Sequence, residues 1–300
     1  MNRPCIDVVV PTFNRAHLLE GIVESLVAQD YPRERYQVIL VDDGSSDETW
    51  PTLERLVRPY DNFKALHMGH AGLSAAKNLG WRSGSGEIVA FTDDDCVADR
   101  RWLEAIAAAF AEHPEALGLQ GQTLTVPKQV TPFTHQIVVR RPNTIYQSCN
   151  VAYRRAVLLS VEGFDEAAHY AEDSQLGAAV SAEGPILFCP AMLIIHPPRP
   201  RVFAGRAEWE QRLKGWWRLY RRHPDFFRRT MGRHFLLHGI VRWGVLSTAK
   251  EIVIHLPWLF RHPPSYMEFL ARLLRERIIL CATLPRFWRA HKGCLKKSTR

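Results

Sequence analysis

Three short runs of mostly apolar, often β-branched residues and one weaker run recur in the N-terminal third of the chain, and segments of helical periodicity separate them. The runs occupy residues 6–10, 38–41, 63–66 and 88–91, and the helical segments occupy residues 18–27, 45–57 and 74–81. Ser45 and Glu48 fit a capping box at the start of the second helical segment. Alternation of continuous apolar strands with helices is typical of a parallel sheet that is covered on both faces. We therefore predict an α/β fold with a mainly parallel sheet.

Acidic side chains follow two of these predicted strands, at the point where each strand ends. Asp42 and Asp43 follow the second strand, and Asp93, Asp94 and Asp95 follow the fourth. Because ligands of open α/β sheets bind beyond the carboxyl ends of the strands, we expect both groups to lie in one crevice. Adjacent carboxylates repel one another unless a cation or solvent compensates them, and oxygen ligands of this kind suit Mg²⁺ or Mn²⁺. The alternative is a solvated acidic turn before the next helix.

The region between residues 99 and 198 is predicted to continue this fold with less regular elements. The pattern favours a helix over 102–110, an antiparallel strand over 117–126, a loop over the site at 127–145, a strand over 146–152 and a helix over 154–160. Glu172 and Asp173 open a further helix, and two short strands over 186–188 and 192–195 run into His196. Since a helix dipole favours carboxylates in the first turn, charge compensation is an alternative explanation for Glu172 and Asp173.

Proline and charge divide the chain near residue 198. Pro197, Pro198 and Pro200 follow the last predicted strand. Residues 199–300 contain 23 Lys and Arg against 6 Asp and Glu, a net charge of +17, whereas residues 1–198 carry a net charge of −9. Such asymmetry suggests two tasks, with the basic region facing a polyanion. We therefore expect two regions, residues 1–198 and residues 199–300.

The basic region interleaves arginines with tryptophans and phenylalanines. Apolar segments at 234–260 and 266–284 are predicted to be helical, and a basic tail covers 286–300. Helices with one basic and one Trp-, Phe- and Leu-rich face lie in the membrane interface plane. The competing explanations are nucleic-acid binding and helical packing with a solvated basic face. We expect an anionic membrane surface as the partner and no nucleic acid.

Cysteine usage and the N-terminal residues bear on the compartment. The six cysteines form no CxxC pair, which argues against a zinc site and a disulfide framework. No apolar signal-peptide core precedes the first strand, and no run of about eighteen uncharged apolar residues occurs. We expect a cytoplasmic protein that is peripheral on the inner face of the cell membrane.

The order of these motifs resembles glycosyltransferase family 2. The motifs are DVVVPTFNR at residues 7–15, VDDGS at 41–45, the acidic triplet at 93–95 and the Glu172–Asp173 pair. The resemblance covers about residues 5–198. It implies a GT-A fold, a nucleotide-sugar donor, a Mg²⁺ or Mn²⁺ ion and inversion at the anomeric carbon.

The resemblance implies particular roles in donor binding. Pro11, Thr12 and Arg15 lie where the family places the nucleotide, and Asp43 matches the carboxylate that accepts a hydrogen bond from the base, typically uracil. Lys77 stands where the family often has arginine, so it keeps the charge but loses the bidentate geometry.

The resemblance also implies which residues bind the metal ion and which residue acts as the general base. Asp93 and Asp95 match the outer positions of the family's DXD motif, and Asp94 is placed near the ribose or an adjacent water. His196 matches a histidine that is often near the metal, with a packed imidazole as the alternative. Asp173 matches the general base. The acceptor side is assigned to Asn150 and Glu172.

These features predict an inverting transferase that moves one sugar, most simply from a UDP-sugar, to a membrane-associated glycan or lipid-linked acceptor. The processive synthases' Gln-x-x-Arg-Trp signature is absent, which argues against a polymer synthase. A nucleotidyltransferase is the first alternative, but residues 11–15 contain no glycine to hold a triphosphate. A non-catalytic nucleotide-binding module is the second, and the filled acidic positions argue against it.

Overall fold

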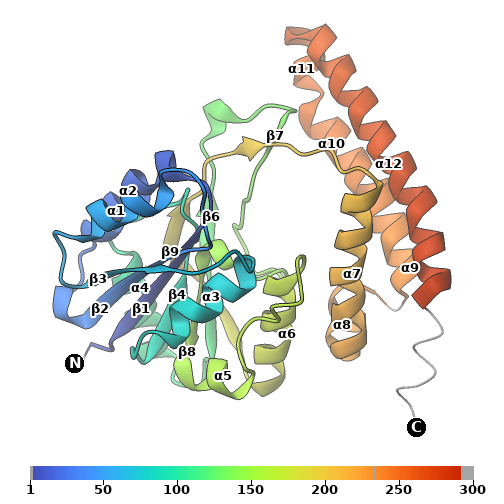
Figure 1. Ribbon diagram of the computed structural model, residues 1–300. Coiled ribbons are helices and arrows are strands. Elements are labelled where there is room, and N and C mark those ends of the chain that lie inside the picture. The colour runs from blue at the N-terminus through green and yellow to red at the C-terminus, as the bar shows by residue number, and fades with distance from the viewer. Residues whose placement is uncertain (1–2, 233, 292–300) are drawn as a thin grey trace. The chain divides into compact units, whose positions relative to one another are not determined.

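The computed structural model describes residues 3–232 and 234–291 (Figure 1). Its contacts divide the chain into two compact units. The first unit comprises Met1–Pro127 and Gln136–Pro197, and the second comprises Lys128–His135 and Pro198–Arg300, each within the described residues. Residues 128–135, which the sequence assigned to a loop over the site, therefore belong to the second unit.

An eight-stranded sheet forms the centre of the first unit, in the order β3-β2-β1-β4-β8-β6-β9-β5. The strands are β1 (Ile6–Thr12), β2 (Tyr36–Asp42), β3 (Phe63–His67), β4 (Ile88–Phe91), β5 (Val97–Ala98), β6 (Gly118–Leu124), β8 (Val151–Arg154) and β9 (Ile186–Ile195). The first four strands are parallel to one another, as predicted. Strand β8 runs antiparallel to both β4 and β6, and β9 is parallel to β6, so the sheet is mixed but mainly parallel.

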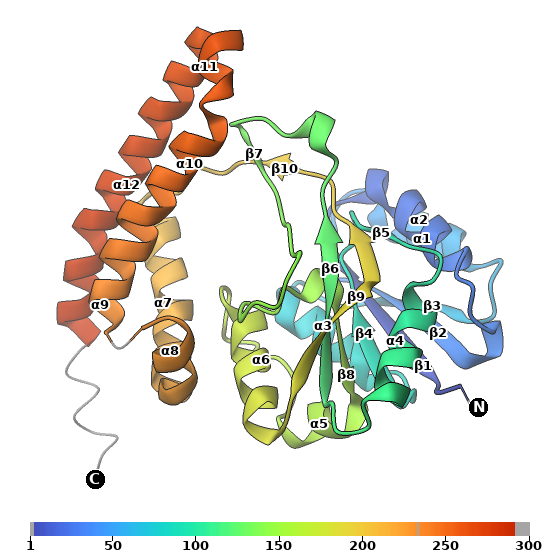
Figure 2. The ribbon, with the colours of Figure 1, turned by 180° about the vertical axis from the view of Figure 1, so that it is seen from behind.

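Helices cover both faces of this sheet (Figures 1 and 2). They are α1 (Leu19–Val27), α2 (Thr49–Val57), α3 (Leu73–Arg82), α4 (Trp102–Glu112), α5 (Arg155–Ser160) and α6 (Glu172–Glu183). Val8 and Val10 of β1 pack into one core with α1, α2 and α4, while Val9 packs into a second core with α3, α5 and α6. Because alternate residues of a strand point to opposite faces, the continuous apolar run of β1 supplies both cores.

Three local predictions were wrong. Ser45 does not cap α2, because its hydroxyl bonds Asp42 Oδ1 and its oxygen accepts from the backbone N–H of Asn14. Cys149 lies in a 3₁₀ turn (Ser148–Asn150) that precedes β8, not within a strand. The two short strands predicted near the end of this unit form the single strand β9, which pairs with β6 through a β-bulge beside Gly121.

Helices dominate the second unit. They are α7 (Arg206–Arg222), α8 (Pro224–Thr230), α9 (Phe235–His238), a π-helix η5 (Gly239–Leu246), α10 (Ser247–His255), α11 (Pro257–Arg261) and α12 (Pro263–His291). A two-stranded ribbon pairs β7 (Thr134–His135) with β10 (Arg199–Pro200). Residues 292–300 of the predicted basic tail lie outside the described residues.

Aromatic side chains build the core of this second unit. Tyr266, Phe269 and Leu273 of α12 pack with Phe133, which lies in the 128–135 segment, and with Phe203. Trp217 of α7 packs edge-on against Phe235 and Phe287. Among the described residues, no helix combines the length and apolarity that crossing a bilayer requires.

Candidate active site

The acidic triplet after β4 is fastened to the end of β1. Asp94 is 3% exposed, and its two oxygens accept from the Thr12 hydroxyl at 2.7 Å and from Arg15 Nη1 at 2.8 Å. Arg15 Nη1 also lies 3.3 Å from Asp95 Oδ2. Burial raises the pKa of the Asp94 carboxyl, and the Arg15 and Thr12 contacts oppose that rise. Asp94 therefore anchors the triplet, because both of its carboxylate oxygens accept hydrogen bonds from the residues at the end of β1.

His196, at the end of β9, faces the other two acidic residues of the triplet. Its Nε2 atom lies 3.6 Å from Asp95 Oδ1 and 3.9 Å from Asp93 Oδ2. Its Nδ1 atom lies 2.8 Å from the carbonyl oxygen of Pro197, which only accepts hydrogen bonds, so Nδ1 carries a proton. Nε2 is buried and has no hydrogen-bond partner among the described residues. Nε2 thus faces carboxylate oxygens without a hydrogen bond to the described part of the chain, an arrangement that suits a shared bound cation.

The donor set fits a divalent cation. Neighbouring ligands of a Mg²⁺-sized ion lie roughly 3 Å apart and opposite ligands roughly 4 Å apart, given bond lengths of about 2.1 Å. The separations of His196 Nε2 from the two carboxylates fall in this range. Cys96 also lies within reach of this group. Burial raises the pKa of the Cys96 thiol well above its usual value, and sulfur is a softer ligand than Mg²⁺ or Mn²⁺ prefers.

Lys77 holds the second acidic group, at the start of α6. Its buried ammonium donates to Asp173 Oδ1 at 3.2 Å and to the Ser148 hydroxyl, and it lies 3.8 Å from Glu172 Oε1. The Ser148 N–H donates to the other Asp173 oxygen at 3.0 Å. Burial alone would lower the pKa of Lys77, but the charges of Asp173, Glu172 and Asp93 outweigh it and raise that pKa. Lys77 is therefore a buried cation that orients Asp173.

Glu172 differs from its neighbour in this site. Burial, and then the charge of Asp173, raise the pKa of Glu172 to about 7, although Lys77 opposes the change. The charge of Asp93 contributes to the pKa of both Glu172 and Lys77. The acidic triplet and the Glu172–Asp173 pair therefore influence one another electrostatically, which places them in one site.

Asp43 supports the glycine loop before α3. Its carboxylate accepts from the backbone N–H of Ala71 at 2.8 Å and of Gly72 at 2.9 Å. His70 Nδ1 lies 2.9 Å from the same carboxylate, and the His70 ring stacks on the partly exposed Phe13 ring with 4.3 Å between centroids. Sequence reasoning missed His70, Phe13 and Ser148, because no pattern along the chain marks contacts between distant loops.

Two of the predicted residues, Pro11 and Asn150, are buried among structural contacts of the sheet. Pro11 is buried in β1, opposite Val41 of β2. Asn150 is buried, and its amide accepts from Trp102 Nε1 and donates to the carbonyls of Gln122 and Met192. These bonds favour a structural role for Asn150, joining β6 and β9 to α4, over a contact with an acceptor.

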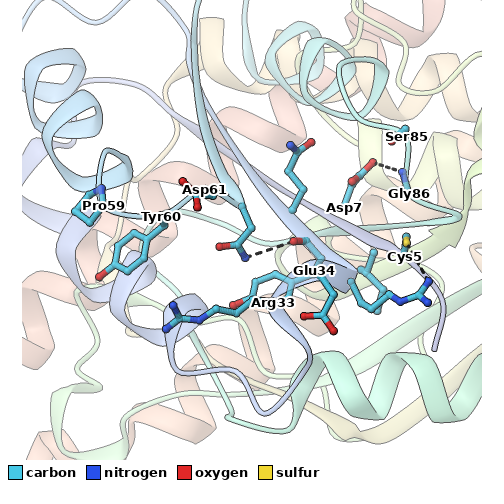
Figure 3. Close-up of a pocket in the computed structure, with 14 residues that line it drawn as sticks. Cys5, Asp7, Arg33, Glu34, Pro59, Tyr60, Asp61, Ser85 and Gly86 are labelled. Atoms are coloured by element: carbon cyan, nitrogen blue, oxygen red, sulfur yellow. Dashed lines mark hydrogen bonds between the residues drawn. The ribbon is translucent and has the colours of Figure 1, made fainter. Parts of the chain in front are cut away.

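A cavity of about 570 Å³ lies at the other end of the strands (Figure 3). Its lining includes Cys5 and Asp7 near the start of β1 and Tyr36 at the start of β2. Asp7 accepts from the Gly86 N–H at 2.8 Å and pairs with Arg155, so it fastens the turn before β4. Because open α/β sheets bind ligands at the carboxyl ends of their strands, this cavity is not the candidate active site.

A family model and several relatives each match part of the chain. The family model for glycosyl transferase family 2 matches residues 7–159. The glycosyltransferase AglE of Haloferax volcanii is 35% identical over 102 residues, which is 34% of this chain and 34% of AglE. The GalNAc(5)-diNAcBac-PP-undecaprenol beta-1,3-glucosyltransferase of Campylobacter jejuni is 39% identical over 94 residues, or 31% of this chain and 30% of that enzyme. The matches thus span about a third of these relatives.

Solved structures extend the similarity to most of the chain. Staphylococcus aureus TarS 1–349 in complex with UDP-GlcNAc has a TM-score of 0.63 and 20% identity, and covers 96% of this chain and 92% of that one. The mannosyltransferase PcManGT of Pyrobaculum calidifontis, in complex with GDP-Man and Mn²⁺, has a TM-score of 0.60 and 19% identity. The match covers 95% of this chain and 88% of the PcManGT chain. This likeness shows a GT-A fold. Since the family model matches just over half of the chain, the chain belongs to glycosyl transferase family 2.

Proposed function

We propose that this protein is an inverting, metal-dependent glycosyltransferase that moves one sugar from a UDP-sugar to a hydroxyl of a membrane-associated glycan or lipid-linked acceptor. One observation carries the proposal. A donor set of two carboxylates and an imidazole nitrogen that makes no hydrogen bond within the residues that the structure describes lies near a third carboxylate, Asp173, that a buried lysine orients. The first group suits a diphosphate-bound cation, and the second suits removal of a proton.

Asp93, Asp95 and His196 would hold Mg²⁺ or Mn²⁺, with the donor diphosphate completing the shell. The bound ion would act as a Lewis acid that stabilises the negative charge on the departing nucleoside diphosphate. The Mn²⁺ in the PcManGT complex supports this assignment. Arg15 and Thr12 keep the triplet in place through Asp94, so we assign them to positioning the donor site.

Asp173 would accept the proton of the acceptor hydroxyl as that oxygen attacks the sugar. Inversion requires this base on the face of the sugar opposite the leaving group. Lys77 and the Ser148 N–H each engage one Asp173 oxygen, which fixes the carboxylate and favours its ionised form. Asp173 retains lone pairs for the incoming hydroxyl, because an ionised carboxylate has about four acceptor sites.

The donor and the acceptor are inferred from chemistry and from relatives. The structure of TarS with UDP-GlcNAc supports a UDP-sugar, and the stacked Phe13–His70 pair beside Asp43 offers a flat, partly apolar surface to a base. The Campylobacter jejuni relative acts on an undecaprenol-linked glycan. The basic second half supports such an acceptor, and we place the enzyme on the inner face of the cell membrane.

The test measures Mn²⁺-dependent turnover of a panel of UDP-sugars by the wild type, Asp95→Ala, Asp173→Asn and the exposed control Asp61→Asn. We expect Asp95→Ala to lose its response to Mn²⁺. We expect Asp173→Asn to lose about 10²–10⁴-fold in kcat while it still binds UDP, since that is the range for a general base. The control should match the wild type. Unchanged turnover in both active-site variants would contradict the residue assignments, and release of pyrophosphate instead of UDP would indicate nucleotidyl transfer.

A further inference from the structure

Helix α12 exposes a continuous apolar stripe, which we define as Met267, Ala271, Leu274, Ile278, Cys281 and Ala282. The largest members are strongly exposed: Met267 by 58%, Leu274 by 50% and Ile278 by 69%. From Met267 to Cys281 successive members are three or four residues apart, and Ala282 is four residues after Ile278, so the six lie on one side of the helix. The opposite side of α12 is already packed, because Phe269, Leu273 and other core residues are buried there.

The neighbouring helices expose apolar side chains as well. Val245, Val253 and Leu256 are exposed along η5 and α10, and Phe260 of α11 is 80% exposed. Figure 2 shows α10 and α11 running beside α12, and the α12 stripe approaches η5 where Cys281 lies next to Gly244. The exposed apolar stripe of α12, with a packed core behind it, indicates an interaction site.

Positive charge surrounds this surface. Arg275 and Arg286 flank the stripe on α12, and Lys250 and Arg261 lie on α10 and α11; all four are exposed. The acidic side chains of residues 234–291 are already paired, because Glu251 contacts Arg201, Glu268 contacts Arg272 and Glu276 contacts Arg212. The flanking cations are therefore not neutralised by the acidic groups of these helices.

We propose that the α12 stripe, together with Phe260, enters the headgroup region of an anionic bilayer while the flanking arginines and lysine bind lipid phosphates. Apolar side chains bordered by basic ones are the features that hold a helix in the membrane interface. A symmetric contact between two copies would instead bring the same arginines together, which opposes that alternative. The inference deepens the proposed function by naming the surface that brings the enzyme to its acceptor.

The experiment measures partition of the full-length protein to vesicles of phosphatidylcholine alone and of phosphatidylcholine with about one-third phosphatidylglycerol. The wild type should bind the anionic vesicles and bind the neutral ones weakly. Leu274→Ser/Ile278→Ser should lower partition at least tenfold, because two exposed apolar side chains lose their insertion. Arg275→Gln/Arg286→Gln should lower it by roughly fivefold per arginine on anionic vesicles alone. The control Leu159→Ser removes a side chain that is 62% exposed in the first unit and should change nothing.

Three outcomes would overturn the proposal: anionic vesicles that do not bind the wild type, stripe variants that bind as well as the wild type, or a dimer in solution that only the stripe variants dissociate. Hydrolysis of the soluble UDP-sugar, measured without vesicles, should be equal in the stripe variants and the wild type, which also shows that the variants fold. Asp95→Ala should retain vesicle binding. Loss of vesicle binding and loss of catalysis are thus separate results.

Discussion

Glu172 and Asp173 are neighbours in the sequence, yet their carboxyl groups lie in different surroundings. Asp173 receives a hydrogen bond on each oxygen, from Lys77 and from the Ser148 N–H. Glu172 Oε1 lies 3.8 Å from Lys77 Nζ, a longer contact, and burial beside a second carboxylate raises the pKa of Glu172 to about 7. Near neutral pH the pair therefore holds less than two full negative charges. The hydrogen bonds that orient Asp173 favour it over Glu172 as the candidate base.

We predict that Glu172→Gln stabilises the first unit at pH 8 and that the gain disappears as the pH falls to 5. The pKa of Glu172 is higher in the folded protein than its ordinary value of 4.5, so the folded state binds more protons between these values. Stability therefore falls as pH rises from about 4.5 to 7, and glutamine removes that loss. We expect a gain of about 1–3 kcal/mol at pH 8.

Denaturant unfolding at the two pH values measures this difference. Glu54→Gln changes an exposed glutamate of α2 and serves as the control, with no pH-dependent gain expected. An equal effect of Glu172→Gln at pH 5 and pH 8 would show that Glu172 titrates near its ordinary value in the folded protein.

At the scale of elements, α3 is the helix that brings Lys77 to Asp173, and its position depends on close packing against the sheet. A Cβ atom on Gly80 would overlap Val9 Cγ1 of β1 and lie 3.2 Å from Val41 Cγ2 of β2. The glycine therefore sets the distance between helix and sheet. Any larger residue must move α3, and with it the ammonium of Lys77.

We predict that Gly80→Ala destabilises the first unit by about 1–3 kcal/mol, the usual cost of overpacking a core. The matched control is Gly21→Ala in α1, where a Cβ would have no neighbour within 4 Å. That change should instead stabilise by about 0.5–1 kcal/mol, because alanine favours the helix. Thermal unfolding of both variants measures the contrast. Equal shifts of the melting temperature in the two variants would mean that α3 can move away from the sheet without loss of stability.

The sequence predicted elements well where local pattern and tertiary structure agree. Strands β1, β2 and β4 carry mostly apolar runs because helices cover both of their faces, and the predicted strand over 88–91 coincides with β4. The weaker run over 63–66 forms β3, which lies at the edge of the sheet. The pattern failed around Cys149, where the side chain of Asn150 bonds three distant groups and holds a 3₁₀ turn. It also failed at 128–135, because Phe133 packs with residues that follow more than sixty positions later.

The site was predictable to the extent that its side chains follow strand ends. Asp93, Asp95 and His196 meet because β4 and β9 deliver them, and the family resemblance named all three. The pairing of Lys77 with Asp173 was not predicted, since it depends on how α3 and α6 pack on one face of the sheet. The sequence therefore identified the acidic groups but not the contacts that orient them.

At the scale of the whole molecule, charge is distributed in two ways. The acidic first half, with net charge −9, gathers carboxylates around a site suited to a cation, whereas the second half carries a net charge of +17. Binding of a cation in the first region relies on ligands in direct contact with the ion. Binding of the basic region to an anionic membrane relies on many exposed cations, and salt screens their attraction to that surface.

We predict that raising the ionic strength from about 0.05 M to about 0.5 M separates these two activities, because the Debye length falls to a few ångströms over this range. Binding to anionic vesicles should fall at least tenfold. Turnover of a soluble UDP-sugar at saturating Mn²⁺ should change by less than about twofold, since direct coordination is screened far less than exposed charge. Co-sedimentation and UDP release, measured on the same preparation, make the comparison, with a non-ionic osmolyte as the control for solvent effects. A parallel decline of both quantities would mean that the same charges serve vesicle binding and catalysis, and the assignment of the two halves to separate tasks would fail.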